Sequence, residues 1–451
     1  MLRRDFLKLS LGGLALPDLL ALRARAGDGP GGFGKAKRCI VLFCWGGISH
    51  LDTFDLKPNA PSNIRGTFKE ISTTVPGIRI GEHLPGFART MKHWAIVRSA
   101  HHNAPSHRSG AYWNLTGHQP QNLAGNWPAS RADWPCLGSM IWQAKGATKN
   151  ALPGAVALPY TIYDGGVANG QDAGFLGMGM DPAVFRPTGE SLKIYQGKSP
   201  SSGRIDLGLP KGVSRQRLGQ RRGLIRGFGK TKGSAFKLEA EAMTRSREMA
   251  LDMLLNPTVH AAFDLEKEPR ALREKYGMHI CGQSVLTARR LTEVGVPVAT
   301  VYCAAGDLNG SSGSHFDTHA DNFNKLKNNM LPPFDQAASA LVEDLRERGR
   351  LDETLIVMLT DFGRTPQINK GAGRDHFSGV YSAVFAGGGI RGGQIYGKSN
   401  AIGFEPAEHA CGPPDLHATI FHALGIDPDH MIYDADNRPL PLCDGKPLPL
   451  F

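Results

Sequence analysis

A chain of 451 residues with 41% hydrophobic side chains buries a large core, either as one large α/β domain with insertions or as two or three units. Its 56 glycines and 30 prolines indicate many loops, and its seven cysteines form no CxxC pair, which argues against a zinc ribbon or a dithiol redox motif. The formal net charge is +11, and residues 211–237 contain nine lysines or arginines but only two aromatic residues. That run indicates a solvated face, a linker or contact with an anionic surface, and it argues against a nucleic-acid groove.

The first 26 residues have the pattern of an export signal. A paired arginine opens the run RRDFLK at 3–8, a short apolar stretch follows at 11–16, and small residues at 24–26 offer a cleavage site. We predict a twin-arginine signal peptide over 1–26 and a periplasmic or extracellular location; the alternative is an ordinary basic helix. The apolar stretch is too short to cross a membrane, and no later segment is long enough, so no transmembrane helix is expected.

Strands and helices alternate through the rest of the chain. Strands are predicted at 39–45, 94–98, 296–303, 354–359 and 382–385, and helices within 103–117, through most of 236–291, and at 332–350 and 415–424. This alternation predicts an α/β fold with a mostly parallel central sheet and helices on both faces. Residues 120–235 show no clear period and are interpreted as long connections. We expect a signal peptide followed by a single domain at 35–451, with a long inserted segment at about 120–292.

Four clusters of acidic and histidine side chains stand far apart along the chain, at 50–55, 315–319, 360–364 and 374–376. The third follows a predicted buried strand, and open α/β sheets bind ligands at the carboxyl ends of their strands. Residues two apart in an extended segment point the same way, so Asp317 and His319 can reach one metal ion. Oxygen and imidazole donors suit Zn²⁺, Mn²⁺, Mg²⁺ or Ca²⁺; for each residue alone, the alternative is a capping carboxylate or a hydrogen-bonded imidazole. The predicted metal ligands are Asp52, Asp317, His319, Asp361, Asp375 and His376.

A polar run at 101–109 adds candidate catalytic residues. Arg108 is suited to clamp a phosphate or sulfate, and Ser106 or Ser109 is a candidate nucleophile; the alternative is a surface turn that opens a helix. Arg364 either binds an anion or pairs with a carboxylate. Asn169 belongs either to a substrate-binding loop or to an ordinary turn.

These clusters carry a family resemblance. The runs GGISHLDTFD at 46–55, FDTH at 316–319, DFGRTP at 361–366 and GRDH at 373–376 resemble an exported, sulfatase-like family of unknown function, DUF1501, within the alkaline phosphatase superfamily. The resemblance extends over the whole mature chain. In addition, DLHATIFHALG at 415–425 is similar to the closing helix of sulfatases, and LTG at 115–117 is similar to the helix that follows their nucleophile. The resemblance implies an alkaline-phosphatase-like fold and an ester hydrolase site with one or two metal ions.

The resemblance also assigns roles to individual residues. It implies that Asp317 and His319 are one pair of metal ligands, that Asp361 ends the superfamily's Asp-His-Gly strand, that His376 is a later ligand, and that His107 stands at the nucleophile position. The chain departs from the pattern at Phe362, where the superfamily has a histidine ligand, and at Trp45, where it has an aspartate that Asp52 would have to replace. No cysteine or serine lies in the sulfatase modification pattern, which argues against formylglycine chemistry.

Three functions follow as expectations. The first is an exported metal-dependent hydrolase that acts on an anionic phosphate or sulfate ester or on a glycan carrying one. The alternative is a secreted, non-catalytic binding protein on a degenerate sulfatase-like scaffold. A third, weaker alternative is an accessory partner of exported electron-transfer proteins, which no CxxCH haem motif supports. The sequence predicts no particular oligomeric state.

Overall fold

The computed structural model describes residues 31–185 and 255–451, apart from 126, 147, 149–151, 305–307, 309–313 and 435, together with the single residues 214, 220 and 251. The predicted signal peptide, nearly all of the basic run at 211–237 and most of the predicted helical residues before 255 lie outside the described residues. Among the helices of the described part, none combines the length and the apolar content that a membrane crossing requires.

Eight strands form the central sheet: β1 (Arg38–Cys44), β4 (Trp94–Ala100), β5 (Ala155–Leu158), β6 (Ala183–Val184), β7 (Val298–Tyr302), β8 (Thr354–Thr360), β11 (Tyr381–Ala386) and β12 (Gln394–Tyr396). Their order is β12-β4-β11-β8-β1-β7-β5-β6. Strand β1 pairs in parallel with β7 and β8, and only β11 runs antiparallel to its neighbours. The mostly parallel sheet predicted from the sequence is therefore confirmed.

Four antiparallel two-stranded ribbons lie outside this sheet. They pair β2 (Glu70–Ser72) with β3 (Arg79–Gly81), β9 (Gly363–Arg364) with β10 (His376–Phe377), β13 (Lys398–Ser399) with β14 (Pro406–Glu408), and β15 (Met431–Tyr433) with β16 (Pro439–Pro441). The β9–β10 ribbon places His376 directly opposite Arg364.

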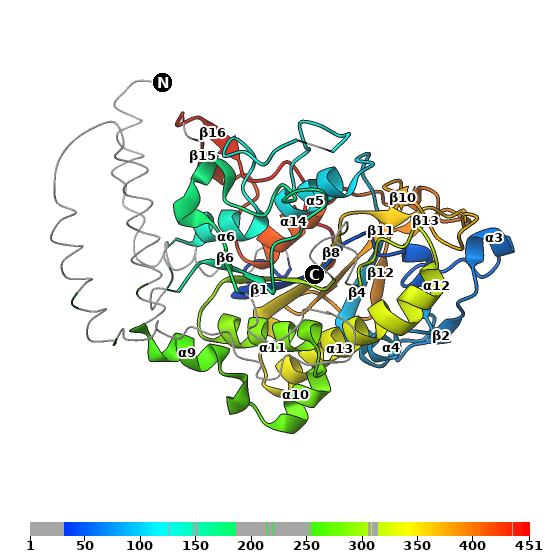
Figure 1. The fold of residues 1–451 in the computed structure, drawn as a ribbon, viewed down its shortest axis with the longest axis horizontal. Helices are drawn as coiled ribbons and strands as arrows, with labels where there is room; N and C mark the ends of the chain where they lie inside the picture. Colours follow the sequence, from blue (N-terminus) through cyan, green and yellow to red (C-terminus); the bar gives the residue numbers. More distant parts are fainter. Residues whose placement is uncertain are drawn as a thin grey trace, which may run out of the picture.

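Ten α-helices are described: α3 (Ser62–Arg65), α4 (Pro85–Thr90), α5 (His107–Thr116), α6 (Leu137–Lys145), α9 (Pro257–Phe263), α10 (Arg270–Tyr276), α11 (Ile280–Glu293), α12 (Asn322–Lys325), α13 (Leu331–Glu347) and α14 (Pro413–Ala423). Figure 1 shows α5, α6 and α14 on one face of the sheet and α10, α11 and α13 on the other. Helix α11 packs on β1 and β7, whereas α5 packs on β8. Helices on both faces are thus confirmed.

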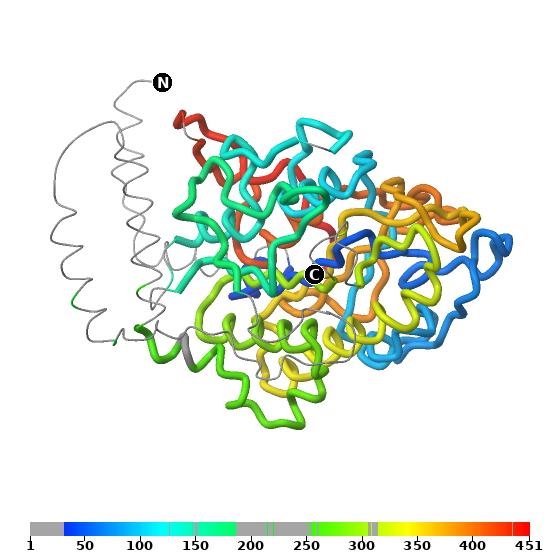
Figure 2. Tube along the Cα trace, viewed as in Figure 1, coloured from blue at the N-terminus to red at the C-terminus, as the bar shows by residue number. Residues whose placement is uncertain are grey.

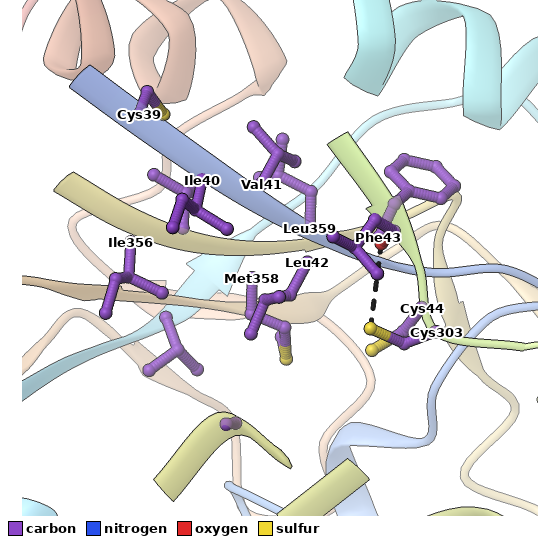
Figure 3. Packing of buried hydrophobic residues seen from close by; sticks show 14 of the residues in the cluster. Cys39, Ile40, Val41, Leu42, Phe43, Cys44, Cys303, Ile356, Met358 and Leu359 are labelled. Carbon is purple, nitrogen blue, oxygen red and sulfur yellow. Dashed lines mark hydrogen bonds between the residues drawn. The ribbon is translucent and has the colours of Figure 1, made fainter. Parts of the chain in front are cut away.

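The middle strands are apolar because both of their faces are covered. Every residue of β8, and all of β1 except Arg38, is buried. Figure 3 shows side chains of these two strands packed together, with Cys44 and Cys303 beside each other at one end. All seven cysteines are buried and none forms a disulfide. The strands therefore form a rigid platform for the residues that follow them.

The end of the chain packs back onto α5. In Figure 2 the red C-terminal part lies beside the cyan residues that follow position 100. The Nε2 atom of His417, on α14, donates to the carbonyl oxygen of Asn114 at 2.9 Å. A Cβ on Gly117, which ends α5 with a φ of +75°, would meet the His417 ring at 2.8 Å. This packing fixes the orientation of α5, whose first residue is His107.

Residues 120–185 differ from the prediction of long connections. They supply α6 as well as β5 and β6, which extend the central sheet beyond β7. Strand β5 has four residues and β6 has two, so neither is long enough to show a periodic pattern in the sequence. Part of the expected insertion is therefore an integral part of the sheet.

Candidate metal centre

The candidate centre lies where the middle strands end. Asp361 directly follows β8, and the turn Gly46-Gly47 follows Cys44 and Trp45 at the end of β1. Both glycines have positive φ, at +104° and +80°. A Cβ on Gly46 would lie 2.5 Å from the backbone nitrogen of Asp317, so the segment carrying Asp317 approaches this turn more closely than any side chain would allow.

Four side chains from three distant parts of the chain meet at this edge. The group consists of His107 from the start of α5, Asp317 and His319 from the segment after β7, and His376 from β10, and one ligand atom from each lies within 4.8 Å of all the others. The Nε2 atoms of the three histidines lie 3.2, 3.1 and 3.5 Å, respectively, from Oδ1 of Asp317. Ligand atoms about 2.1 Å from a tetrahedral ion are about 3.4 Å apart, so these spacings fit one ion.

Each imidazole is oriented by a partner on its other nitrogen. Nδ1 of His107 bonds the Asp361 carboxylate, Nδ1 of His319 lies 2.7 Å from Asp375 Oδ1, and Nδ1 of His376 lies 3.2 Å from the carbonyl oxygen of Pro105. All three partners are acceptors, so in the neutral ring the proton sits on Nδ1 and the Nε2 lone pair faces the group. Metal-ligating histidines are typically held in this way.

Two of these lone pairs have no hydrogen-bond partner. Nε2 of His107 and Nε2 of His376 are buried and, although close to Asp317, make no hydrogen bond of acceptable geometry. Buried polar atoms without partners are uncommon and call for an explanation such as a bound ion. The donor set, the spacing and the orphaned nitrogens therefore all fit a divalent metal ion.

Asp361 is held from every side. Its Oδ1 accepts from the backbone nitrogens of Gly46 at 3.1 Å and Gly47 at 2.6 Å, and its Oδ2 bonds His107. His102 Nε2 donates to the Asp361 carbonyl oxygen at 2.7 Å, while His102 Nδ1 accepts from the backbone nitrogen of Ala104. Asp361, predicted as a metal ligand, is thus placed as the partner that orients a ligand.

Among the described side chains that contact Asp317, Arg364 supplies the permanent positive charge. Its side chain is fully buried, and its guanidinium donates to Asp317 Oδ1 at 2.5 Å and to the carbonyl oxygens of Gly46 and Gly47. Of the two alternatives for Arg364, the structure therefore favours pairing with a carboxylate. Three carboxylates (Asp317, Asp361 and Asp375) and one guanidinium leave a net charge of −2 with neutral imidazoles, which a divalent cation would balance.

The pKa of each side chain in the group depends on the charges of its neighbours. Burial would raise the pKa of the Asp317 carboxyl, but the three imidazoles and the Arg364 guanidinium outweigh burial and hold that pKa far below its usual value. Burial would lower the pKa of His107, but the flanking carboxylates of Asp361 and Asp317 more than offset it, so the pKa is raised. The hydrogen bond to Asp317 is the main reason that the pKa of His319 is raised as well. Without a metal, protons on these rings take over part of the charge balance.

Asp52, which the sequence predicts as a metal ligand, does not lie in this group. Its carboxylate forms a fully buried ion pair with Arg374, with contacts of 2.8 and 3.1 Å, and also accepts from Ser49 and Asn322. Its oxygens are therefore occupied. Asp375 likewise contacts the group only through His319 and belongs with the orienting partners.

The other predicted residues lie beside the centre rather than in it. Arg108 donates to the carbonyl oxygens of Trp127 and Val167 and to Asn169 Oδ1 at 3.0 Å, so it ties two loops to α5. Asn169 is fully buried in that network, and its side chain is not open to a substrate. Ser109 is also fully buried, with its hydroxyl bonded to Ser106. In this structure the three side chains predicted as anion clamp, substrate contact and nucleophile make hydrogen bonds within the protein.

From the sequence, His107 is expected near the reacting atom and not among the ligands. The sequence does not mark His102 or the carbonyl of Pro105 as orienting groups. One signal for His107 is local: it follows Ser106, whose side chain caps α5, so it occupies the helix N-terminus that faces the strand ends. No comparable local pattern marks His102 or Pro105.

Comparisons with known proteins agree with the motif resemblance at the level of family. Residues 36–449 match the family described as "Protein of unknown function (DUF1501)". No curated protein has detectable sequence similarity to the chain.

Similar solved structures include Ps i-CgsB in complex with k-i-k-neocarrahexaose, with 12% identity, a TM-score of 0.41, and coverage of 91% of this chain and 74% of that chain. Another is the phosphonate monoester hydrolase SpPMH from Silicibacter pomeroyi, with 12% identity, a TM-score of 0.37, and coverage of 92% and 76%. A third is a protein in the alkaline phosphatase superfamily from Vibrio parahaemolyticus, with 10% identity, a TM-score of 0.37, and coverage of 88% and 68%.

Substitutions can distinguish an acidic residue that stabilises the fold from a residue that binds metal. Asp52→Asn leaves the buried Arg374 guanidinium without its counter-charge and is expected to lower the free energy of unfolding by about 3–5 kcal/mol. The metal content of the folded protein is expected to stay unchanged. His319→Ala, at a more exposed ligand, is the matched control and should lose metal with little loss of stability. Urea unfolding and elemental analysis measure both properties; metal loss in Asp52→Asn with normal stability would contradict the assignment.

Proposed function

This chain belongs to the DUF1501 family, a family of unknown function, and we propose that it is an exported metal-dependent hydrolase of phosphate or sulfate esters. The observation that carries the proposal is the convergence of three imidazole nitrogens on one carboxylate oxygen, at spacings suited to one ion. A divalent ion bound there polarises an ester oxygen and lowers the pKa of a water molecule. The motif resemblance to sulfatase-like proteins supports esters of phosphate or sulfate as the substrate class.

Two sets of residues have different roles at the centre: one would bind the ion, and the other orients the imidazoles that bind it. His107, His319, His376 and Asp317 would hold the ion. Asp361, Asp375 and the Pro105 carbonyl orient the three imidazoles so that their Nε2 atoms face it. With neutral imidazoles the centre carries a net negative charge, which repels an anionic ester. A bound divalent ion would balance that charge, so substrate binding as well as the reaction is expected to depend on metal.

Access comes from the side of His319 and Asp375. Their side chains are 45% and 51% exposed, whereas the His107 side chain is 4% exposed. An ester therefore approaches the centre across His319 and Asp375, and the rest of the substrate extends toward solvent. This geometry suits a glycan or another large anionic molecule as well as a small ester.

One observation favours the alternative of a non-catalytic binding protein. Four protein ligands can fill the coordination shell of a tetrahedral ion, as in structural zinc sites, and catalytic sites usually keep one position open. The hydroxyl of Ser109 is also buried and donates to the carbonyl oxygen of Ser106, so this candidate nucleophile is not free to attack a substrate. Under this alternative the ion stabilises the strand-end segments, and the protein binds an anionic glycan without cleaving it.

Hydrolysis of chromogenic esters separates the two functions. The purified mature protein, reloaded with Zn²⁺ or Mn²⁺, is expected to cleave a nitrophenyl phosphate or sulfate. Asp317→Asn removes the charge on which the ligands converge and is expected to reduce kcat/KM by about 10³-fold, because a bound metal contributes several kcal/mol to the transition state. Arg108→Gln, away from the ligands, should retain most of the metal. No cleavage of any ester by fully metal-loaded protein would favour the binding function.

Metal affinity is expected to depend on pH. The raised pKa values of His107 and His319 mean that protons stay on these rings to higher pH than on a free imidazole, and those protons compete with the metal. Affinity should therefore rise with pH through these raised pKa values and then level off, while Asp317 stays ionised. Isothermal titration at ~pH 6 and ~pH 8, in buffers of different ionisation enthalpy, measures affinity and proton release. A pH-independent affinity without proton release would contradict this coupling.

A further inference from the structure

The geometry points to a centre that holds one transition-metal ion and excludes a second, an inference that rests on the proposed metal dependence and specifies its form. Two features on the Asp361 side of the group support a single ion. The Asp361 carboxylate is already used within the protein, and aromatic rings surround His107 where further ligands would have to stand. The ion is bound by three imidazoles and one carboxylate.

The Asp361 carboxylate has little capacity left for a metal. A carboxylate has about four acceptor positions. Backbone nitrogens of Gly46 and Gly47 take two of them on Oδ1, and His107 Nδ1 takes one on Oδ2. The residue is also fully buried, so its carboxylate is not open to solvent. Binding a second ion at Asp361 would break the bond that orients His107 and expose two backbone N–H groups without partners.

Aromatic side chains stand where a second ion would need ligands. The Phe362 ring lies 4.8 Å, centroid to centroid, from both His107 and His376, and the Trp45 ring lies 5.5 Å from His107. Both rings are fully buried. Phe362 is wedged against Gly47, where an added Cβ would meet the ring at 2.8 Å. Neither ring offers a lone pair, and the four-residue group is the only cluster of its kind in the described part of the chain.

The donor set also selects the class of ion. Mg²⁺ and Ca²⁺ prefer six or more oxygen ligands, whereas imidazole nitrogen suits Zn²⁺ and its first-row neighbours. Three nitrogens and one oxygen therefore favour Zn²⁺ or Co²⁺ over Mn²⁺, Mg²⁺ and Ca²⁺. Of the four cations that the sequence leaves open, the donor set favours Zn²⁺.

Equilibrium dialysis of the full mature protein against Zn²⁺, followed by elemental analysis, tests the inference. One ion per chain is expected at saturation, and an excess of Mg²⁺ or Ca²⁺ should not displace it. With Co²⁺, the visible spectrum should have the strong absorption of a four-coordinate site and should saturate at one equivalent. Asp361→Asn should still bind one ion, about 10- to 100-fold more weakly, because it disturbs an orienting partner and removes no ligand.

The outcomes separate this inference from the proposed function. Two ions per wild-type chain, with one lost in Asp361→Asn, would overturn the single-ion centre and leave metal-dependent hydrolysis standing. Displacement by Mg²⁺ or Ca²⁺ would overturn the choice of ion class. No bound ion in the folded wild-type protein would overturn both. One ion per chain without ester hydrolysis would support the centre and contradict the hydrolase. The wild-type stoichiometry decides the main point even if Asp361→Asn fails to fold.

Discussion

The candidate site depends on one buried carboxylate. Asp317 Oδ1 lies within 3.5 Å of three imidazole nitrogens and also accepts from the Arg364 guanidinium. The imidazoles and the guanidinium favour the ionised form of this carboxyl and hold its pKa far below its usual value. The surrounding structure supports this arrangement: a bond to Asp361 aims His107, a bond to Asp375 aims His319, and glycines at the end of β1 let the Asp317 segment approach. Charge balance then makes the same residues suited to a divalent cation.

The fold brings these residues together because parallel strands end at a common edge. Residues about 210 positions apart, His107 and Asp317, become neighbours only because β8 and β1 end beside each other and α5 packs on β8. The Asp361 carboxylate links the turn after β1 to His107. Its Oδ1 accepts from backbone N–H groups of the turn, and its Oδ2 bonds the His107 ring. A substitution of Asp361 is therefore expected to disturb both the turn after β1 and the orientation of His107.

Much of this could be predicted from the sequence, for identifiable reasons. Long apolar runs such as 39–45 and 354–359 are confirmed as the middle strands, because a strand buried on both faces needs continuous apolar side chains. The two-residue spacing of Asp317 and His319 correctly predicts that they reach one point. The sequence does not show that Asp52 pairs with Arg374, because a buried ion pair and a metal ligand use the same residue type and only the distance between the two side chains distinguishes them. The short strands β5 and β6 and the Pro105 carbonyl leave no pattern in the sequence.

The most direct test of the account is a crystal structure of the mature protein grown with Zn²⁺, with data collected on both sides of the zinc absorption edge. The account predicts one anomalous peak per chain, bounded by Nε2 of His107, His319 and His376 and by a carboxylate oxygen of Asp317. A peak beside Asp52 and Arg374, or the four side chains in place around no peak at all, would contradict it.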